Sequence, residues 1–347
     1  MYIKKILWAI ALIGLVVAAY FAYYVYSAMF KPNTAFNNEE AYIFVPSNAD
    51  YNVVREQLEP LLVDMDKFEA LAKQKQYTTN VKAGRYVIKK GMNNNDIINS
   101  IRINNIPIQI AFNNQESLEK LAGRIAMQIE PDSLSLIAVM KDDVFLNAND
   151  FSEATALGMY IPNSYELFWN TSPEAFRDRM LTEYGRFWND SRKAKAEKLN
   201  MSINDVMALA SIVYEESKQA EEQPRLAGVY INRLRIGMPL QADPTLKFAA
   251  YQLPEYKDTV IKRVLNKHKE IDSPYNTYKY AGLPPGLIAM PDISAIEAVL
   301  NYEKHNYLYF AADANRIGYH KFAKTLSQHN ANARAYQRYL SSQGIYN

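Results

Sequence analysis

The longest uninterrupted apolar segment lies near the start of the chain. Residues 6–30 contain no charged side chain, and a helix of that length can cross the hydrocarbon core of a bilayer. The segment therefore predicts a membrane anchor. Lys4 and Lys5 precede it and Lys31 follows it, which favours a cytoplasmic N-terminus at residues 1–5. A cleaved signal peptide is the alternative, but its apolar run would be shorter and a small-residue cleavage site would follow it.

A short β-rich run followed by an amphipathic helix recurs three times after a linker at residues 31–40. The three copies lie at residues 42–58, 84–101 and 108–126, and each passes through a polar turn between strand and helix. We assign residues 41–158 to an α+β region that precedes a second region at residues 159–347. Carbohydrate binding is one role for the first region, and spacing the second region away from the membrane is the other.

In the second region, most apolar residues recur at the spacing of an α-helix. A charged amphipathic pattern predicts a helix at residues 173–198, and an apolar pattern predicts another at residues 224–234. Between them, Ser202 is a predicted N-cap. Asp205 follows at the third helical position, where its negative charge interacts favourably with the helix dipole. The expected fold class is α+β, with a mainly helical second region that also contains β elements.

The helix that follows Ser202 carries an ionisable side chain at an apolar position. At about 100° per residue, Glu216 falls within the apolar stripe of this helix, whereas Glu215 points to one side. The stripe consists of Val206, Leu209, Ile212 and Val213. Because burial disfavours a charged carboxyl, Glu216 should retain its proton and suit general-acid work in glycoside chemistry. In the alternative, Glu216 is solvated at the helix end or paired with Arg225 or Arg233.

Composition narrows the function classes. The 347 residues exceed one typical domain, and 49% of them are hydrophobic, enough for sizeable cores. The formal charge of +2, from 39 basic and 37 acidic residues, does not suggest nucleic-acid binding. The chain has no cysteine, so neither a disulfide nor a cysteine-ligated metal site can form. No HExxH, GxSxG or P-loop motif occurs, and we expect no metal or organic cofactor.

Four motifs in one order resemble the YceG/MltG-like endolytic peptidoglycan transglycosylases. The motifs are AGVYINRLRIGMPLQADPT (227–245), SPYNTYKYAGLPPGLIAMP (273–291), YLYFAA (307–312) and GYHKFAKTLSQHN (318–330). An ungapped alignment on Asn232 and its two successors places the catalytic glutamate of that family on Glu216. An earlier glutamate of the family corresponds to Tyr214 in this chain.

The resemblance implies a fold and an activity. The first region would be a LysM-like module, and the second would be a lysozyme-like, mainly helical catalytic domain introduced by the motif at Met159. The enzyme would cut nascent peptidoglycan strands outside the cytoplasmic membrane and so limit their length. Its products would end in 1,6-anhydro-muramic acid, and Glu216 alone would serve as acid and then as base. Its partners would be glycan strands, penicillin-binding proteins and the cell-wall synthesis machinery.

Polar and aromatic side chains in the matching motifs suit a glycan groove. The expected substrate-binding residues are Ser217, Asn232, Arg233, Gln241, Asp243, Thr245, Tyr275, Asn276, Thr277, Tyr278, His320, His329 and Asn330. Among them, Gln241 and Asn276 are candidates for stabilising the charged transition state. The expected structural supports are Gly282, Pro284, Pro285 and Gly286, which form a rigid turn. Without the resemblance, these segments predict ordinary loops, an Asp-Pro helix start, and structural roles for Arg233 and the two histidines.

Two other functions remain open at the level of the sequence. A lysozyme-like hydrolase would use Asp243 or Glu215 as a second carboxylate that activates water. A noncatalytic peptidoglycan-binding scaffold is favoured by the modular first half and by Tyr214 at the position of a family glutamate.

Overall fold

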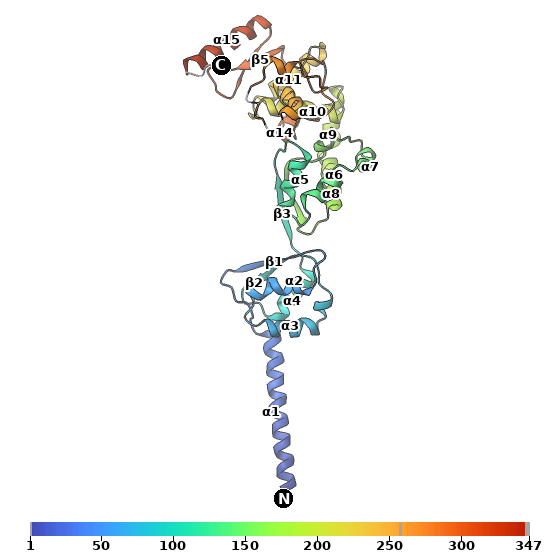
Figure 1. Cartoon of the computed structure of the whole chain (residues 1–347), viewed down its shortest axis with the longest axis vertical. Helices are drawn as coiled ribbons and strands as arrows, with labels where there is room; N and C mark the ends of the chain where they lie inside the picture. Colours follow the sequence, from blue (N-terminus) through green and yellow to red (C-terminus); the bar gives the residue numbers. More distant parts are fainter. Residues whose placement is uncertain (1, 257–258, 262, 344–347) are drawn as a thin grey trace. The chain divides into compact units, whose positions relative to one another are not determined.

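The computed structural model describes residues 2–256, 259–261 and 263–343, which form two compact units (Figure 1). Unit 1 comprises the residues up to Ile110, together with Gln128–Pro131 and Tyr165–Ser172. Unit 2 comprises Ala111–Met127, Asp132–Ser164 and the residues from Pro173 onward. Helices and short two-stranded sheets alternate along the chain, which confirms the α+β class. The assignment of the two regions to LysM-like and lysozyme-like folds, divided at residue 158, stays a prediction.

Unit 1 begins with the predicted anchor. Helix α1 spans Tyr2–Phe30, has a mean hydropathy of 2.3 over its most apolar window and is long enough to cross a membrane. The other elements of the unit are β1 (Glu40–Val45), α2 (Tyr51–Leu58), η1 (Glu59–Leu61), α3 (Met65–Gln74), η2 (Tyr77–Thr79), β2 (Gly84–Lys89) and α4 (Asn94–Ile103). The first two predicted strand–helix copies are confirmed as β1 with α2 and β2 with α4.

Strands β1 and β2 pair antiparallel, with Ile43 opposite Tyr86. Side chains alternate across the strands, so that Ile43 and Val45 are buried while Tyr42 and Phe44 remain exposed. Helices α2 and α4 pack on this sheet (Figure 1) and complete the core of the unit.

A buried amide network holds the end of α1 against the rest of unit 1. The Asn94 side chain donates a 2.8 Å hydrogen bond to the Ala28 carbonyl of α1 and accepts a 2.6 Å bond from Asn33. Asn33 in turn bonds the backbone of Asp64. Because the last carbonyls of a helix have no partner within the helix, Asn94 satisfies one of them.

Unit 2 contains most of the helices. Strands β3 (Pro107–Phe112) and β4 (Asn163–Phe168) pair with each other, and each begins in one unit and ends in the other. The remaining elements are α5 (Leu118–Ala126), α6 (Ser133–Met140), α7 (Asp143–Ala148), η3 (Ala156–Met159), α8 (Pro173–Phe187), α9 (Asp190–Lys198), α10 (Ile203–Glu216), α11 (Gln223–Arg235), α12 (Asp243–Tyr251), η4 (Pro254–Tyr256), α13 (Asn266–Lys269), α14 (Ile293–Leu300), β5 (Tyr309–Ala312), β6 (His320–Ala323) and α15 (Leu326–Ser342). The third predicted strand–helix copy is confirmed as β3 with α5.

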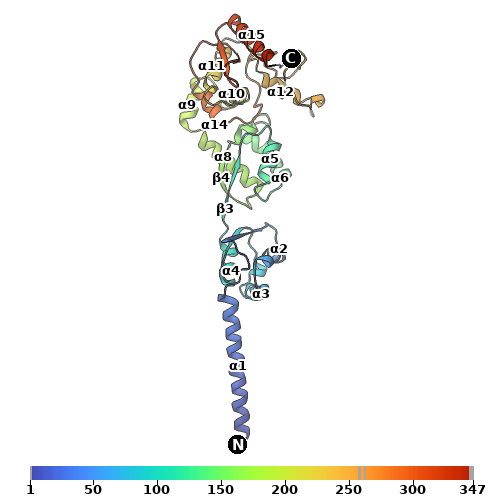
Figure 2. The same ribbon diagram turned by 90° about the vertical axis from the view of Figure 1, so that its left-hand side faces the viewer.

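The core of unit 2 forms where α10, α11 and α14 pack together, and these helices lie side by side in both views (Figures 1 and 2). The predicted cap of α10 is confirmed, because the Ser202 hydroxyl accepts from the Asp205 N–H while the Asp205 carboxylate accepts from the Ser202 N–H. All four aliphatic residues of the predicted stripe are fully buried.

One predicted helix is divided in the structure. The pattern at residues 173–198 predicts a continuous helix, but α8 ends at Phe187 and α9 begins at Asp190. Asn189 caps α9 by accepting a hydrogen bond from the Arg192 N–H, and Trp188 is buried in the core of unit 2. Burial of a large aromatic side chain at the break, with an asparagine cap directly after it, explains why the continuous charged pattern is interrupted.

Replacing Asn94 with alanine should destabilise unit 1, because it leaves the Ala28 carbonyl and the Asn33 amide without their buried partner. We expect a loss of about 1–3 kcal/mol, measured as faster hydrogen–deuterium exchange in peptides covering α4 and β2. Asn99→Ala, at an exposed position of the same helix, is the matched control. Equal exchange in both variants would contradict the role of Asn94.

Candidate active site

A cavity of about 370 Å³ in unit 2 brings together seven of the predicted site residues. They come from α10, α11, the loop before α12, the start of α12, the loop after α13, β6 and α15, and they are Glu216, Arg233, Gln241, Asp243, Tyr278, His320 and His329. Aromatic Tyr309 and Phe310 of β5 complete part of the wall. Segments more than a hundred residues apart in the sequence thus converge on Glu216.

Glu216 is the last residue of α10. The helix stops there because Ser217 adopts an extended backbone with φ −143° and ψ 127°. The Glu216 carboxyl is partly exposed to the cavity, and its Oε1 accepts a 2.9 Å hydrogen bond from the hydroxyl of Tyr230 on α11. Glu215 lies on the exposed side of the helix and pairs with Lys218 at 2.8 Å. The helical stripe therefore distinguishes the two glutamates as predicted.

Burial raises the pKa of the Glu216 carboxyl to about 7. The hydrogen bond from Tyr230 and the positive charge of Arg233 oppose this rise in pKa, and the negative charge of Asp243 adds to it. Near neutral pH the carboxyl therefore exchanges readily between its protonated and ionised forms, as a general acid–base group requires.

The alternative partners of Glu216 are engaged elsewhere. Arg225 pairs with Glu303 at 2.9 Å. The buried Arg233 donates from Nε to the Leu308 carbonyl at 2.7 Å and from Nη1 to the Leu240 carbonyl at 2.5 Å. Among the described residues, neither arginine forms an ion pair with Glu216. Arg233 therefore holds the backbone of two segments beside the cavity and also contributes a positive charge to its wall.

Asp243 and Gln241 present polar groups at the mouth of the cavity. The Asp243 carboxylate accepts a 2.6 Å hydrogen bond from the Tyr278 hydroxyl. Gln241 has a left-handed backbone (φ 48°), an uncommon conformation for a residue with a side chain, and its N–H donates to the Thr277 carbonyl at 3.0 Å. The strained position suggests that the loop is held in one conformation by its neighbours.

Several predicted binding residues lie behind the cavity wall and hold this loop. Thr245 and Thr277 are buried, and their hydroxyls lie 2.8 Å apart. Asn276 is fully buried and donates to the carbonyls of Lys269 and Ile271 at 2.9 and 2.8 Å. Its own oxygen accepts from two backbone N–H groups. With every amide group engaged by backbone, Asn276 does not face the cavity, in contrast to the expectation that its amide would stabilise the reacting sugar.

The other predicted residues also lie outside the cavity lining. Asn232 donates to the carbonyls of His305 and Tyr307, and Tyr275 packs on the ring of Phe248 at 4.6 Å along a different cavity. Ser217 is buried and Asn330 is exposed on α15. The predicted turn, Gly282 to Gly286, lies close to Ala154: a Cβ on Gly286 would come within 2.2 Å of the Ala154 carbonyl oxygen, so only glycine fits there.

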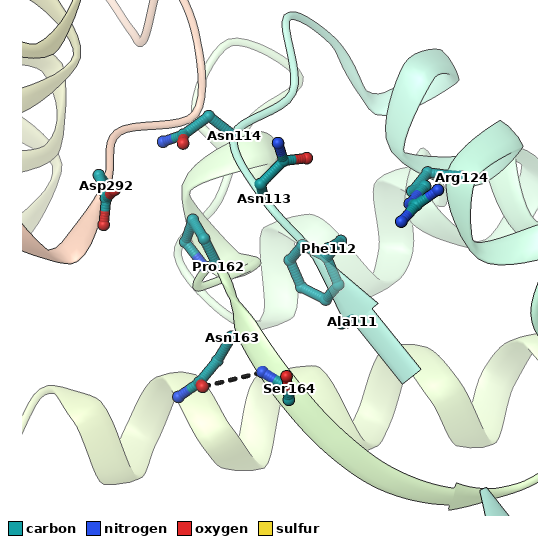
Figure 3. A pocket seen from close by; sticks show the side chains of 9 residues that line it. All are labelled: Ala111, Phe112, Asn113, Asn114, Arg124, Pro162, Asn163, Ser164 and Asp292. Atoms are coloured by element: carbon teal, nitrogen blue, oxygen red, sulfur yellow. Dashed lines mark hydrogen bonds between the residues drawn. The ribbon is translucent and has the colours of Figure 1, made fainter. Parts of the chain in front are cut away.

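Tyr214, at the position of the earlier family glutamate, points away from Glu216. Its hydroxyl donates to Asn114 at 2.7 Å, and the Lys218 ammonium lies 3.4 Å from its ring centre. Asn114 lines a separate polar cavity of about 420 Å³ together with Asp292 (Figure 3). Tyr214 is therefore not among the residues that line the Glu216 cavity.

The two histidines pack against neighbouring aromatic residues of β5. His320 pairs through Nδ1 with Glu222 at 2.9 Å and packs edge-on against Phe310 at 5.1 Å. His329 stacks on Tyr309 at 5.6 Å, and burial lowers its pKa. Among the described residues, no cluster of three histidine, aspartate or glutamate side chains could hold a metal ion.

Tyr230 and Glu222 are site residues that the sequence did not identify. The helical pattern assigns Tyr230 only to the apolar face of α11, and Glu222 precedes that helix as an ordinary charged residue. The hydroxyl of Tyr230 on the apolar face of its helix was the available signal. A buried tyrosine hydroxyl usually has a hydrogen-bond partner, so a polar group was to be expected beside it.

Glu216→Gln should stabilise the chain at alkaline pH and not at acid pH. The folded chain binds the Glu216 proton with a pKa near 7, against an ordinary value of 4.5. The contribution of this carboxyl to the free energy of unfolding is therefore fully present below about pH 4.5. It is lost as the pH rises through 7 and stays absent above that pH. A change of one in pKa corresponds to about 1.36 kcal/mol. Because the carboxyl is partly exposed, the glutamine should restore at most about 3 kcal/mol of unfolding free energy at alkaline pH.

The measurement is the Tm of wild type, Glu216→Gln and the exposed control Glu215→Gln at pH 4 and pH 8. We expect a higher Tm for Glu216→Gln at pH 8 alone. A difference of equal size at both pH values would contradict a raised pKa in the folded chain.

Three comparisons relate this geometry to known proteins. Residues 43–335 match the YceG-like family. The chain is 33% identical over 278 residues to a Bacillus subtilis protein named endolytic murein transglycosylase, covering 75% of this chain and 73% of that protein. A Streptococcus pneumoniae protein of the same name is 27% identical over 293 residues, and the match covers 76% of this chain but only 52% of that protein.

A solved structure agrees with the match. The crystal structure of a YceG-like protein from Listeria monocytogenes is 27% identical, with a TM-score of 0.56, and the match covers 85% of this chain and 99% of that one. The family match covers parts of both units and every residue of the Glu216 cavity. This chain therefore belongs to the YceG-like family.

Proposed function

We propose that this protein is a membrane-anchored endolytic transglycosylase that cleaves peptidoglycan strands, with Glu216 as its acid and base. The observation that carries the proposal is the Glu216 carboxyl, which has a pKa near 7 and faces a cavity lined by polar and aromatic side chains. Membership of the YceG-like family and the names of the relatives support the same activity.

The proposed reaction breaks the β-1,4 bond between N-acetylmuramic acid and N-acetylglucosamine. Protonated Glu216 gives its proton to the bridging oxygen as the bond from that oxygen to C1 of the muramic acid breaks. The C6 hydroxyl of the same muramic acid then attacks C1 and gives its proton to the Glu216 carboxylate. The product ends in a 1,6-anhydro ring, no water is consumed, and Glu216 is protonated again for the next cycle.

Neighbouring groups have separate tasks in this proposal. The Tyr230 hydroxyl donates to Glu216 Oε1 and so orients the carboxyl and supports its ionised form. Gln241, held at the mouth of the cavity, supplies an amide that can bond to the sugar while positive charge develops at C1. The Tyr278 and Tyr309 rings offer flat apolar faces against which pyranose rings can pack.

A hydrolase is the second candidate, because Asp243 supplies another carboxylate in the same cavity. In that mechanism Asp243 would activate water or form a glycosyl-enzyme intermediate. The hydrogen bond from Tyr278 to the Asp243 carboxylate favours a different role, since it holds that oxygen toward the loop.

We place the catalytic unit outside the cytoplasmic membrane, with α1 as a single-pass anchor and residues 1–5 in the cytoplasm. Lys4 and Lys5, at the start of α1 and before its apolar run, support this orientation. In this arrangement a LysM-like region at residues 41–158 would bind the strand or hold the second region away from the bilayer. A lysozyme-like domain at residues 159–347 would cut strands as they are synthesised. Such cutting limits their length and suits association with penicillin-binding proteins.

Incubating the full chain in detergent with purified glycan strands should yield internal fragments that end in 1,6-anhydro-muramic acid. Glu216→Gln keeps the shape of the side chain but has no proton to donate, so its turnover should fall by at least about a hundredfold, the lower range for loss of a general acid. Mass spectrometry distinguishes the anhydro end from a reducing end, which carries one added water. Glu215→Gln is the matched control and should retain wild-type activity.

Each other outcome of this experiment has a definite meaning. Reducing ends from the wild-type chain would replace the transglycosylase by a hydrolase. Binding of strands without any cleavage would favour a scaffold. Substantial activity in Glu216→Gln, with loss in Glu215→Gln, would move the acid to Glu215.

The orientation in the membrane is testable because the chain contains no cysteine. A cysteine at Val144, which is 80% exposed in unit 2, should react with a membrane-impermeant maleimide in intact cells whose outer layers admit the reagent. A cysteine at Lys4 should react only after the membrane is opened. The reverse pattern would overturn the proposed orientation.

A further inference from the structure

A buried carboxylate–imidazole pair lies at the wall of the Glu216 cavity. Glu222 directly precedes α11 and is only 6% exposed. Its Oε2 lies 2.9 Å from Nδ1 of His320, and its Oε1 accepts a 2.6 Å hydrogen bond from the backbone N–H of the same histidine. One carboxylate thus holds both the ring and the main chain of His320.

Glu222 is ionised in this position. Burial alone would raise the pKa of its carboxyl, but hydrogen bonds from the ring and backbone of His320 and from Ser217 keep the pKa below its ordinary value. The partial positive charge at the start of α11 favours the same ionised form. Although Glu222 occupies the N-cap position, its side chain does not cap the helix. Its carboxylate accepts hydrogen bonds from His320 and Ser217 instead.

The ionised carboxylate determines which ring nitrogen of His320 carries the proton. A carboxylate only accepts hydrogen bonds, so Nδ1 must be the donor. In the neutral ring, Nε2 is then an acceptor with a free lone pair. Among the described residues, Nε2 of His320 has no hydrogen-bond partner, and the residue lines the same cavity as Glu216.

The plane of the ring is also constrained. Phe310 packs edge-on against His320, with ring centres 5.1 Å apart and planes at 82°. Phe310 also packs against Tyr230 at 5.8 Å, and Tyr230 donates to Glu216. The orientation of the imidazole and that of the catalytic carboxyl therefore depend on one shared aromatic side chain.

We propose that Glu222 is a positioning residue: it keeps the proton of His320 on Nδ1 and aims Nε2 into the cavity as an acceptor for a hydroxyl or N-acetyl N–H of the glycan. The proposal rests on the proposed function for the identity of the ligand. Its other part, the protonation pattern of the ring, concerns this chain alone and is measurable without substrate.

Glu222→Gln tests the proposal because it conserves shape while reversing one hydrogen bond. The glutamine oxygen can still accept from the His320 backbone N–H, which leaves the NH₂ group facing Nδ1. That contact requires Nδ1 to be the acceptor, so the ring proton moves to Nε2 and the cavity meets a donor instead of an acceptor. An asparagine in place of a triad aspartate acts in this way in serine proteases.

The first readout is ¹⁵N NMR of the histidine rings in the full chain, in detergent micelles with labelled histidine. The chain has four histidines, and His320→Gln identifies the relevant signals. We expect the neutral ring to carry its proton on Nδ1 in the wild type and on Nε2 in Glu222→Gln. An Nε2 proton in the wild type, or an unchanged pattern in the variant, would overturn the proposal.

The second readout is turnover on glycan strands. Glu222→Gln should lose at least about tenfold in kcat/KM, the lower end of what removal of an outer hydrogen-bond partner costs at a catalytic site. In a chain that already carries His320→Gln, the same change should cause no further loss, because the two residues act as a unit. Wild-type turnover in Glu222→Gln, or an additive loss in the double variant, would overturn the proposal.

Glu221→Gln is the matched control, since Glu221 is the preceding, exposed glutamate and pairs with Arg316 outside the cavity. It should change neither the NMR pattern nor turnover. If the wild-type chain cleaves no strands, the proposed function fails. The NMR pattern and the binding of uncleaved strands by Glu222→Gln then decide the positioning role by themselves: weaker binding supports it, and unchanged binding overturns it.

Discussion

The removal of the Glu216 carboxyl from water is the interaction on which the rest of the site depends. Helix α10 packs against α11 and α14 in the core and carries Glu216 as its last residue. At that position the side chain reaches the cavity. Further burial would leave no access for a sugar, whereas full exposure would return the pKa to its ordinary value. The capping box at Ser202 and the aliphatic stripe fix the start and rotation of α10, and they therefore determine where Glu216 emerges.

Much of this arrangement follows from local pattern. A cap residue, a stripe of period 3.6 and a carboxylate inside that stripe sufficed to predict the start of α10 and to separate Glu216 from Glu215. The partners of Glu216 do not follow from local pattern. Tyr230 is fourteen residues away on another helix, and Glu222 meets a histidine 98 residues further along. Contacts of this kind depend on how elements pack, which periodicity does not encode, and the break at Trp188 has the same origin.

The matching loop motifs identified segments that lie at the cavity, but they did not show which of their residues face it. Asn276, Thr277 and Thr245 have the hydrogen-bonding groups that a sugar would require, yet their groups bond to the backbone and to each other behind the cavity. An amide or hydroxyl that satisfies a buried carbonyl has the same chemistry as one that binds a glycan. Only the direction of the side chain separates the two roles. The motif therefore specifies a rigid loop, and that loop presents Gln241, Asp243 and Tyr278 to the cavity.

A single carboxyl can act as acid and then as base only if neither of its forms is strongly preferred. Desolvation favours the protonated form of Glu216, and the hydrogen bond from Tyr230 together with the charge of Arg233 favours the ionised form. These opposing effects leave the pKa near neutral, where a group that gives up its proton recovers it without a large free-energy cost in either direction. Because Arg233 also holds the backbone of two segments, its charge is fixed in place. The balance therefore derives from the packing of unit 2 and does not need a second carboxylate.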